Sequence, residues 1–292
     1  MTAIAERLRG LIPAVPVPFT GTQLDVAAQS AYARWMAEQP VAGVAVWAHT
    51  GRGRHLSAEQ RRVVLESWRE AMPDRVVVAG VHDLTTAIEA RRGRADAMLV
   101  YPEPNDPVAH HARLSRELPV ILFYLYAKAG GVAYDDATLH ALLDLPGVVG
   151  IKVATLDSVM TYQRIAAIVR QHPGKLLITG EDRFLGYSVL MGAESALVGM
   201  GASLTRMQAD LLAAAREQRW SDFIRLSARC DAFAQATFIE PMEGYIRRML
   251  WAVAAEGVIP EQACDDPWGP ELSTEERSAV IRAVTDARAA GG

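Results

Sequence analysis

The hydrophobic pattern of the chain repeats one unit many times: a short apolar run followed by an amphipathic stretch. The apolar runs lie at residues 11–19, 41–49, 75–81, 95–102, 119–126, 148–154, 175–181 and 195–202. They are apolar throughout, without strict alternation, which is typical of strands buried on both faces of a parallel sheet. The pattern therefore predicts eight buried parallel strands.

The stretches between the runs have the signals of helices. Ser57 followed by Gln60 predicts a capping box before an apolar-periodic stretch. Asp25, Asp135 and Asp157 stand at similar points before other helical stretches. The stripe expected to face inward after Asp157 consists of Tyr162, Ile165, Ala166 and Val169.

Eight strand–helix units indicate an α/β fold, the (β/α)8 TIM barrel, which typically takes ~250 residues. We therefore predict a barrel over residues 1–217 and a C-terminal helical appendage over 218–292, packed on the barrel. The appendage contains three helical patterns and no strand pattern. A doubly wound open sheet would alternate in the same way, but no G-x-G-x-x-G follows the first run.

Composition narrows the class of protein. The 292 residues are 50% hydrophobic with a net charge of -4, and no long run of Lys and Arg suggests a nucleic-acid surface. Two cysteines, Cys230 and Cys264, exclude a disulfide framework and lack the paired spacing of a zinc site. No stretch approaches 18 apolar residues, and the N-terminus is a poor signal peptide. We expect a cytoplasmic protein without a metal, a cofactor or a membrane span.

One lysine interrupts an apolar run, in the segment GVVGIKVATLD at residues 147–157. Active sites of TIM barrels lie at the C-terminal ends of the strands, and Lys152 falls near such an end. Burial there would lower the pKa of Lys152 and provide a neutral amine that can form a Schiff base with a ketone. Position alone is equally compatible with a rim lysine that reaches solvent.

Residues 9–255 resemble the dihydrodipicolinate synthase / N-acetylneuraminate lyase superfamily of class I aldolases. The matching segments, in the order of the family, are GLIPAVPVPF, GVAVWAHTGRGRHLSAEQRRVVLE, VVVAGV, LPVILFY, GVVGIK, TGED and LMGAESALVG. GVVGIK is the most specific of these, because its lysine is the Schiff-base residue of the family. The resemblance implies that Lys152 forms the imine.

The family also has a catalytic tyrosine at the end of the fifth strand. Counting forward from Pro119 places Phe123 there, whereas counting back 28 residues from Lys152 places Tyr124 there. We predict Tyr124, with one extra residue in this strand, as the group that transfers protons. The alternatives are that Tyr124 is a core aromatic, or that Tyr126 has this role.

Residues 48–52 correspond to the G-T-T-G-E turn of the family, which binds the carboxylate of a 2-oxo acid. Thr50 and Gly51 preserve this turn, so we predict that they bind substrate. We also predict that His49 contacts substrate. It replaces a hydroxyl of a proton relay and could relay protons itself, or only support the site. Arg52 replaces a glutamate and is expected at the surface.

Other departures from the family concern the substrate. The tyrosine that synthases contribute across a dimer interface is absent from residues 101–106, and Ala129 stands where dihydrodipicolinate synthase has a carboxylate-binding arginine. We therefore expect an aldolase or lyase for another small 2-oxo acid, with Leu197 as a further substrate contact. The alternatives are a Schiff-base dehydratase of a deoxy-sugar acid and a non-catalytic barrel. The resemblance also implies a homo-oligomer, either a dimer or a tetramer.

Overall fold

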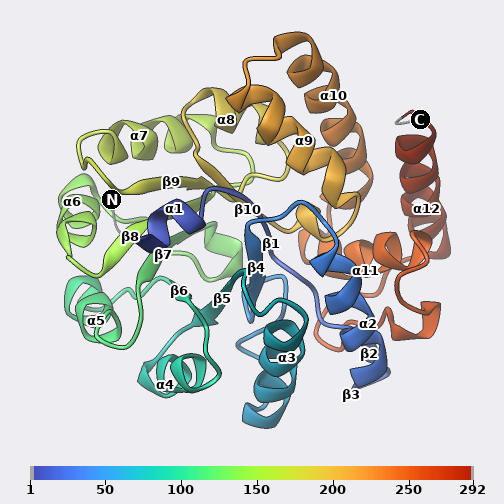
Figure 1. Ribbon diagram of the computed structural model, residues 1–292, viewed down its shortest axis with the longest axis horizontal. Helices are drawn as coiled ribbons and strands as arrows, with labels where there is room; N and C mark the ends of the chain where they lie inside the picture. The colour runs from blue at the N-terminus through green and yellow to red at the C-terminus, as the bar shows by residue number, and fades with distance from the viewer. Residues whose placement is uncertain (1–2, 291–292) are drawn as a thin grey trace.

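A closed ring of parallel strands forms the centre of the molecule (Figure 1). The computed structural model describes residues 3–290. The strands of the ring are β1 (Gly10–Pro13), β4 (Gly43–Val46), β5 (Val76–Val81), β6 (Ala97–Val100), β7 (Val120–Leu125), β8 (Val148–Ala154), β9 (Leu176–Thr179) and β10 (Ser195–Val198). They pair in the order β1-β10-β9-β8-β7-β6-β5-β4, and a parallel bridge between Ala14 and Ala45 joins the two ends. The predicted (β/α)8 barrel is confirmed.

Helices surround the ring on its outside (Figure 1). They are α2 (Val26–Ala37), α3 (Ala58–Ala71), α4 (Leu84–Arg92), α5 (Pro107–Leu114), α6 (Asp136–Asp144), α7 (Val159–Val169), α8 (Leu185–Leu190) and α9 (Thr205–Arg216). A short helix, α1 (Ala3–Arg7), precedes β1, and Ala5 and Leu8 pack with the side chains of the barrel interior. A small hairpin, β2 (Phe19–Thr20) and β3 (Gln23–Leu24), follows β1.

Most of the predicted helix starts are confirmed. Ser57 and Gln60 form the capping box of α3, and the side chains of Asp25 and Asp135 cap α2 and α6. The prediction for Asp157 is wrong, because Ser158 caps α7 by accepting the amide of Thr161. The inward stripe predicted for α7 is buried.

Side chains along each strand alternate between the barrel interior and the layer under the helices. On β7, Phe123 and Leu125 belong to the interior cluster, whereas Leu122 and Tyr124 belong to the outer one. This alternation follows from the two-residue period of a strand. It decides which side chains of each strand can reach a site inside the barrel.

The last part of the chain is helical, with α10 (Trp220–Thr237), α11 (Tyr245–Ala255) and α12 (Thr274–Ala289). Residues 218–290 contain no strand of the sheets, although Asp265 forms an isolated bridge with Phe19. The segment between α10 and α11 approaches the C-terminal ends of the barrel strands, since Phe238 lies beside Gly199. The predicted boundary at residues 217 and 218 therefore separates elements that share one site.

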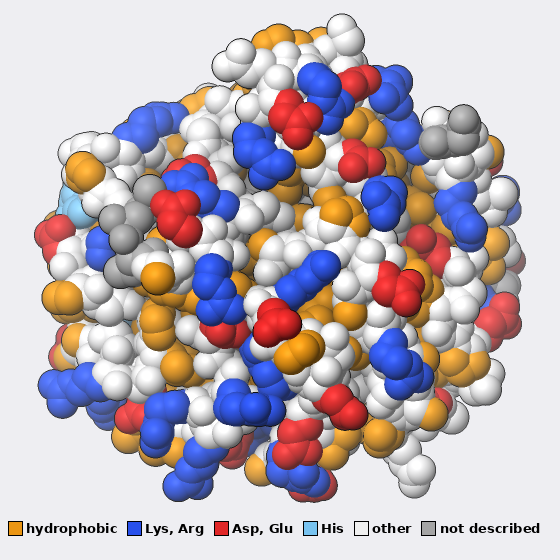
Figure 2. Space-filling model, in the orientation of Figure 1, with side chains coloured by type: hydrophobic (Ala, Val, Ile, Leu, Met, Phe, Trp, Pro, Cys, Tyr) orange, Lys and Arg blue, Asp and Glu red, His pale blue; other side chains and the backbone are white. Residues whose placement is uncertain are grey.

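The distribution of surface charge and the length of the apolar helices test the expectation of no nucleic-acid surface and no membrane span. Acidic and basic side chains are interspersed over most of the face that Figure 2 shows, as the small net charge of the sequence suggests. Within residues 3–290, none of the helices combines the length and the apolar character that a bilayer crossing requires.

Candidate active site

Lys152 points from β8 into the barrel interior. It pairs in register with Phe123 of β7 and Ile178 of β9, and only 5% of its surface is exposed. The Nζ atom lies 4.2 Å from the centroid of the Phe123 ring. Burial lowers the pKa of Lys152, and the charges of Asp182 and Glu181 offset this only in part. The neutral, nucleophilic form of the Lys152 amine is therefore more favoured in this site than it would be in water.

The prediction that Tyr124 faces Lys152 is wrong. Tyr124 pairs with Val153 and lies in the layer outside the barrel, while Phe123 is the residue opposite Lys152. Counting back from Lys152 fails because the pairing of β7 and β8 shifts between Val120 and Ile121. The residue in register with Lys152 therefore carries a phenyl ring without a hydroxyl group.

A small cavity, here called the inner cavity, surrounds the amine of Lys152. Its volume is about 20 Å³, which is about the space that one water molecule needs. Leu197 is fully buried in the barrel interior and is not part of this lining, and its contact with substrate stays a prediction. The polar side chains of the lining are His49, Thr50, Tyr126, Lys152, Asp182 and Tyr245.

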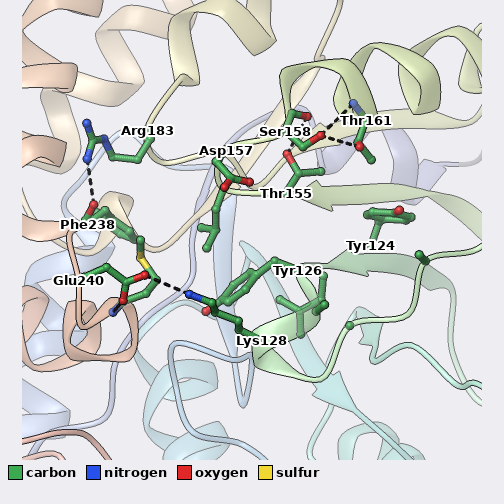
Figure 3. Close-up of a pocket in the computed structure, with 16 residues that line it drawn as sticks. Tyr124, Tyr126, Lys128, Thr155, Asp157, Ser158, Thr161, Arg183, Phe238 and Glu240 are labelled. Atoms are coloured by element: carbon green, nitrogen blue, oxygen red, sulfur yellow. Dashed lines mark hydrogen bonds and ion pairs between the residues drawn. The ribbon is translucent and has the colours of Figure 1, made fainter.

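Figure 3 shows the residues that line a larger cavity of about 590 Å³, here called the outer cavity. It adjoins the inner cavity, because the two have lining residues in common. At one side Lys128 pairs with Glu240 at 3.2 Å, and Arg183 donates to the carbonyl of Phe238 at 3.0 Å. The Tyr124 ring lies at the other side (Figure 3). The two cavities share their lining residues Leu125, Tyr126, Leu156 and Phe238, which form the wall between them.

The turn at residues 48–52 contributes Thr50 to the inner cavity. The Oγ1 atom of Thr50 lies 3.0 Å from the hydroxyl of Tyr245. Gly51 does not line the cavity, and its amide donates to the carbonyl of Ala48 at 3.0 Å. Thr50 therefore lies at the cavity and Gly51 does not, and binding of a carboxylate by this turn stays a prediction.

Glu243 joins two of the polar residues at the rim of the inner cavity. Its Oε1 atom lies 2.9 Å from Nε2 of His49 and accepts the hydroxyl of Tyr126 at 2.7 Å. Burial alone would raise the pKa of Glu243, but His49, Tyr126 and Arg52 outweigh it and lower this pKa to about 2. The Glu243 side chain is 36% exposed, so the group connects the cavity with solvent.

Arg52 is buried, contrary to the expectation of a surface position. Its guanidinium donates to both carboxylate oxygens of Asp266, at 3.1 and 2.7 Å, and to Glu243 at 2.8 Å. These partners come from the C-terminal extension, and sequence reasoning missed them along with Tyr245. The available signal was the arginine itself, because a buried charge in a tight turn requires an acidic partner.

Two acidic residues after β9 have different surroundings. Glu181 accepts the amides of Thr155 and Leu156 at 2.6 and 3.0 Å, and thereby holds the loop after β8. Asp182 instead lines the inner cavity, and its Oδ1 atom accepts the amide of Met200 at 2.7 Å. Burial raises the pKa of Asp182, offset in part by the amide of Met200 and the charge of Lys152.

A closed (β/α)8 barrel with a buried lysine at the C-terminal ends of its strands is the arrangement of a Schiff-base lyase or aldolase of class I. The profile of the Dihydrodipicolinate synthetase family matches residues 7–287, and the chain belongs to this family.

Individual proteins of the same family are similar over most of the chain. The 4-hydroxy-tetrahydrodipicolinate synthase of Ruegeria pomeroyi is 28% identical over 283 residues, 91% of this chain and 95% of that protein. The N-acetylneuraminate lyase of Citrobacter koseri is 28% identical over 221 residues, 70% of this chain and 72% of that protein. A similar solved structure is that of YagE, a prophage protein of E. coli K12 that belongs to the dihydrodipicolinic acid synthase family, in complex with pyruvate. Its TM-score is 0.86 at 19% sequence identity, and the match covers 96% of this chain and 98% of YagE. The family and these relatives indicate a lyase of the aldolase type.

Proposed function

We propose that the protein is a Schiff-base lyase in which the amine of Lys152 condenses with the carbonyl of a 2-oxo acid. The observation that carries this proposal is the burial of that amine against an apolar ring, which lowers its pKa. The pyruvate complex of the similar YagE supports a 2-oxo acid as the ligand class.

The reaction follows from the chemistry of an imine. The neutral amine adds to the ketone carbon, and loss of water gives a protonated imine on Lys152. In a cleavage, this cation accepts the electron pair of the C3–C4 bond, which gives an enamine. In a dehydration, it accepts the pair of a C3–H bond as a base removes the proton, and the enamine then expels the C4 hydroxyl group, which leaves as water after taking up a proton. Thr50 would bind the substrate carboxylate through its hydroxyl, which lies inside the same cavity.

Substrate entry requires movement in the wall between the two cavities. The inner cavity holds about 20 Å³, less than the volume of a three-carbon acid. Leu156 and Phe238 contribute to this wall from loops rather than from strands. We infer that these loops shift when a 2-oxo acid binds, and that the rest of the substrate occupies the outer cavity.

Two reaction outcomes remain within the proposal, cleavage of a C–C bond and dehydration of a deoxy-sugar acid. We favour C–C cleavage, because the two curated relatives above are named as a 4-hydroxy-tetrahydrodipicolinate synthase and an N-acetylneuraminate lyase. Product analysis with a panel of 2-oxo acids separates an aldehyde product from loss of water. Assembly into a dimer or tetramer stays a prediction, to be measured by analytical ultracentrifugation.

The test is reductive trapping. The sequence contains only three lysines, Lys128, Lys152 and Lys175. Incubation with pyruvate and sodium borohydride is expected to add one reduced pyruvyl group, and peptide mass spectrometry is expected to locate it on Lys152. Lys175→Arg is a matched control, because burial also lowers the pKa of Lys175 but its amine is held by the carbonyls of Leu145 and Val148.

The control variant is expected to form the adduct as the natural chain does, and Lys152→Ala is expected to form none. An adduct that forms equally on all three lysines would contradict the proposal. So would the absence of any adduct with pyruvate and a panel of other 2-oxo acids, which would favour a non-catalytic barrel.

A further inference from the structure

The inner cavity lacks a hydroxyl group at the position where a tyrosine would transfer protons next to the imine. Phe123 stands in register with Lys152, and its ring covers the amine at 4.2 Å. Tyr124 points to the other side of the strand. A Schiff-base reaction still needs a group that accepts and returns a proton beside the imine.

The hydroxyl groups that do line the inner cavity are poor candidates for this role. The hydroxyl of Tyr126 donates to Glu243 at 2.7 Å, and that of Tyr245 is bonded to Thr50 at 3.0 Å. Burial raises the pKa of both tyrosines above its ordinary value. Neither phenol is therefore ready to lose its proton.

Asp182 is the carboxyl group that lines the same cavity as Lys152. It is 7% exposed, and the amide of Met200 fixes its Oδ1 atom at 2.7 Å. Lys152 lines the same small cavity, and the charge of Asp182 opposes the lowering of the Lys152 pKa by burial. Its neighbour Glu181 is occupied by the amides of the loop after β8 and does not line the cavity.

We propose that Asp182 is the proton-transfer residue of this site, in the role that a tyrosine opposite Lys152 would have. The inference rests on the proposed function, because it needs an imine on Lys152. After the imine has formed, the carboxylate of Asp182 removes a proton from C3 of the bound 2-oxo acid. The C–H electron pair becomes the C2=C3 bond of an enamine, and the imine nitrogen becomes neutral.

The reverse step returns the proton from the carboxylic acid of Asp182 to C3. In the cleavage direction, the same carboxylate removes the proton of the C4 hydroxyl, the C3–C4 bond breaks, and an aldehyde leaves while its electron pair enters the enamine. Protons and electrons balance in both steps without a further reagent.

The test separates imine formation from proton transfer. In D2O, the natural chain is expected to exchange the methyl protons of pyruvate for deuterium, which proton NMR follows directly. Asp182→Asn is expected to slow this exchange by roughly 10²–10⁴-fold. The borohydride adduct on Lys152 is expected to accumulate still, because the amine remains in place.

A matched control removes a different buried carboxyl group. Glu256 accepts the amide of Leu204 and the hydroxyl of Ser203 outside both cavities, and burial raises its pKa as it does that of Asp182. Glu256→Gln is expected to leave the exchange rate unchanged. Asp182→Ser serves as a second variant, because it removes the carboxyl group without introducing an amide.

A rescue experiment distinguishes chemistry from packing. Introducing Phe123→Tyr into the Asp182→Asn background places a phenol opposite Lys152, and we expect it to restore exchange at least about 10-fold. Loss of a purely structural contact would not be repaired in this way.

The outcomes are distinct. If the natural chain forms no adduct, the proposed function fails. If it forms the adduct and the two Asp182 variants exchange at the natural rate, only the role of Asp182 is overturned. If Asp182→Asn loses the adduct together with the exchange, Asp182 supports imine formation rather than proton transfer, and the proposed role is also overturned.

Discussion

The buried ion cluster around Arg52 provides a quantitative test of how the C-terminal extension holds the mouth of the barrel. The substitution Asp266→Asn removes the negative charge that pairs with Arg52. The side chains of Arg52 and Asp266 are 7% and 1% exposed, and two hydrogen bonds at 3.1 and 2.7 Å join them. Removal of one partner of a buried pair typically costs about 3–5 kcal/mol, because the other charge stays buried and unpaired.

Glu243 reduces this cost. Its carboxylate remains 2.8 Å from the guanidinium of Arg52 and neutralises part of the charge after the substitution. We therefore expect a loss at the lower end, about 3 kcal/mol in the free energy of unfolding. At about 2 °C per kcal/mol for a chain of this size, the melting temperature should fall by about 6 °C.

Differential scanning calorimetry and urea unfolding at neutral pH measure this change. Glu59→Gln is the control, because Glu59 pairs with Arg62 at 2.6 Å on the surface, where both side chains are more than half exposed. This variant is expected to keep the melting temperature of the natural chain. If Asp266→Asn lowers the free energy of unfolding by less than about 1 kcal/mol, the pair contributes no more than an exposed salt bridge, and the cluster is not closed to solvent.

Three further predictions concern the site. Because burial lowers the pKa of Lys152, the rate of adduct formation with pyruvate should rise with pH and level off, with a midpoint below the ordinary lysine pKa of ~10.4. A midpoint at or above that value would contradict the proposed burial of the amine. Because the pKa of Glu243 in the folded chain is about 2, its stabilisation is fully present above the unfolded value of ~4.3 and is lost as the pH falls towards 2. Thermal melting of the natural chain and of Glu243→Gln should therefore differ near neutral pH and converge across this acidic window, whereas a constant difference would argue against it. Leu156→Ala removes part of the wall between the cavities. It should lower the KM for 2-oxo acids longer than pyruvate more than it lowers the KM for pyruvate. Equal changes in KM for all of these acids would show that Leu156 does not limit entry.

Much of the fold could be predicted from local pattern. Each of the eight apolar runs coincides with all or most of one strand of the barrel, because strands covered on both sides are apolar throughout. The caps at Ser57, Asp25 and Asp135 were also readable, since capping needs only a side chain and an amide a few residues later. The error at Asp157 is a displacement by one residue, which local signals do not resolve.

The candidate site was predictable only where one position carried the signal. Lys152 is such a position, because a charged residue in an apolar strand is conspicuous in the sequence. The residue opposite it was not, because a shift of one residue in strand pairing exchanges the two faces of the strand. The shift at Val120 and Ile121 therefore turns Phe123, not Tyr124, towards the amine.

By itself, the sequence determined the alternation of strands and helices and the presence of one lysine at a strand end, because both depend on neighbouring residues. Which side chains surround that lysine depends on the tertiary structure. Strand register placed Phe123 in its cavity, and the loop after β9 placed Asp182 there. The fold of the C-terminal extension brought Glu243 and Asp266 to the buried Arg52. Contacts between residues about 200 positions apart depend on how the whole barrel closes, and no local pattern encodes them.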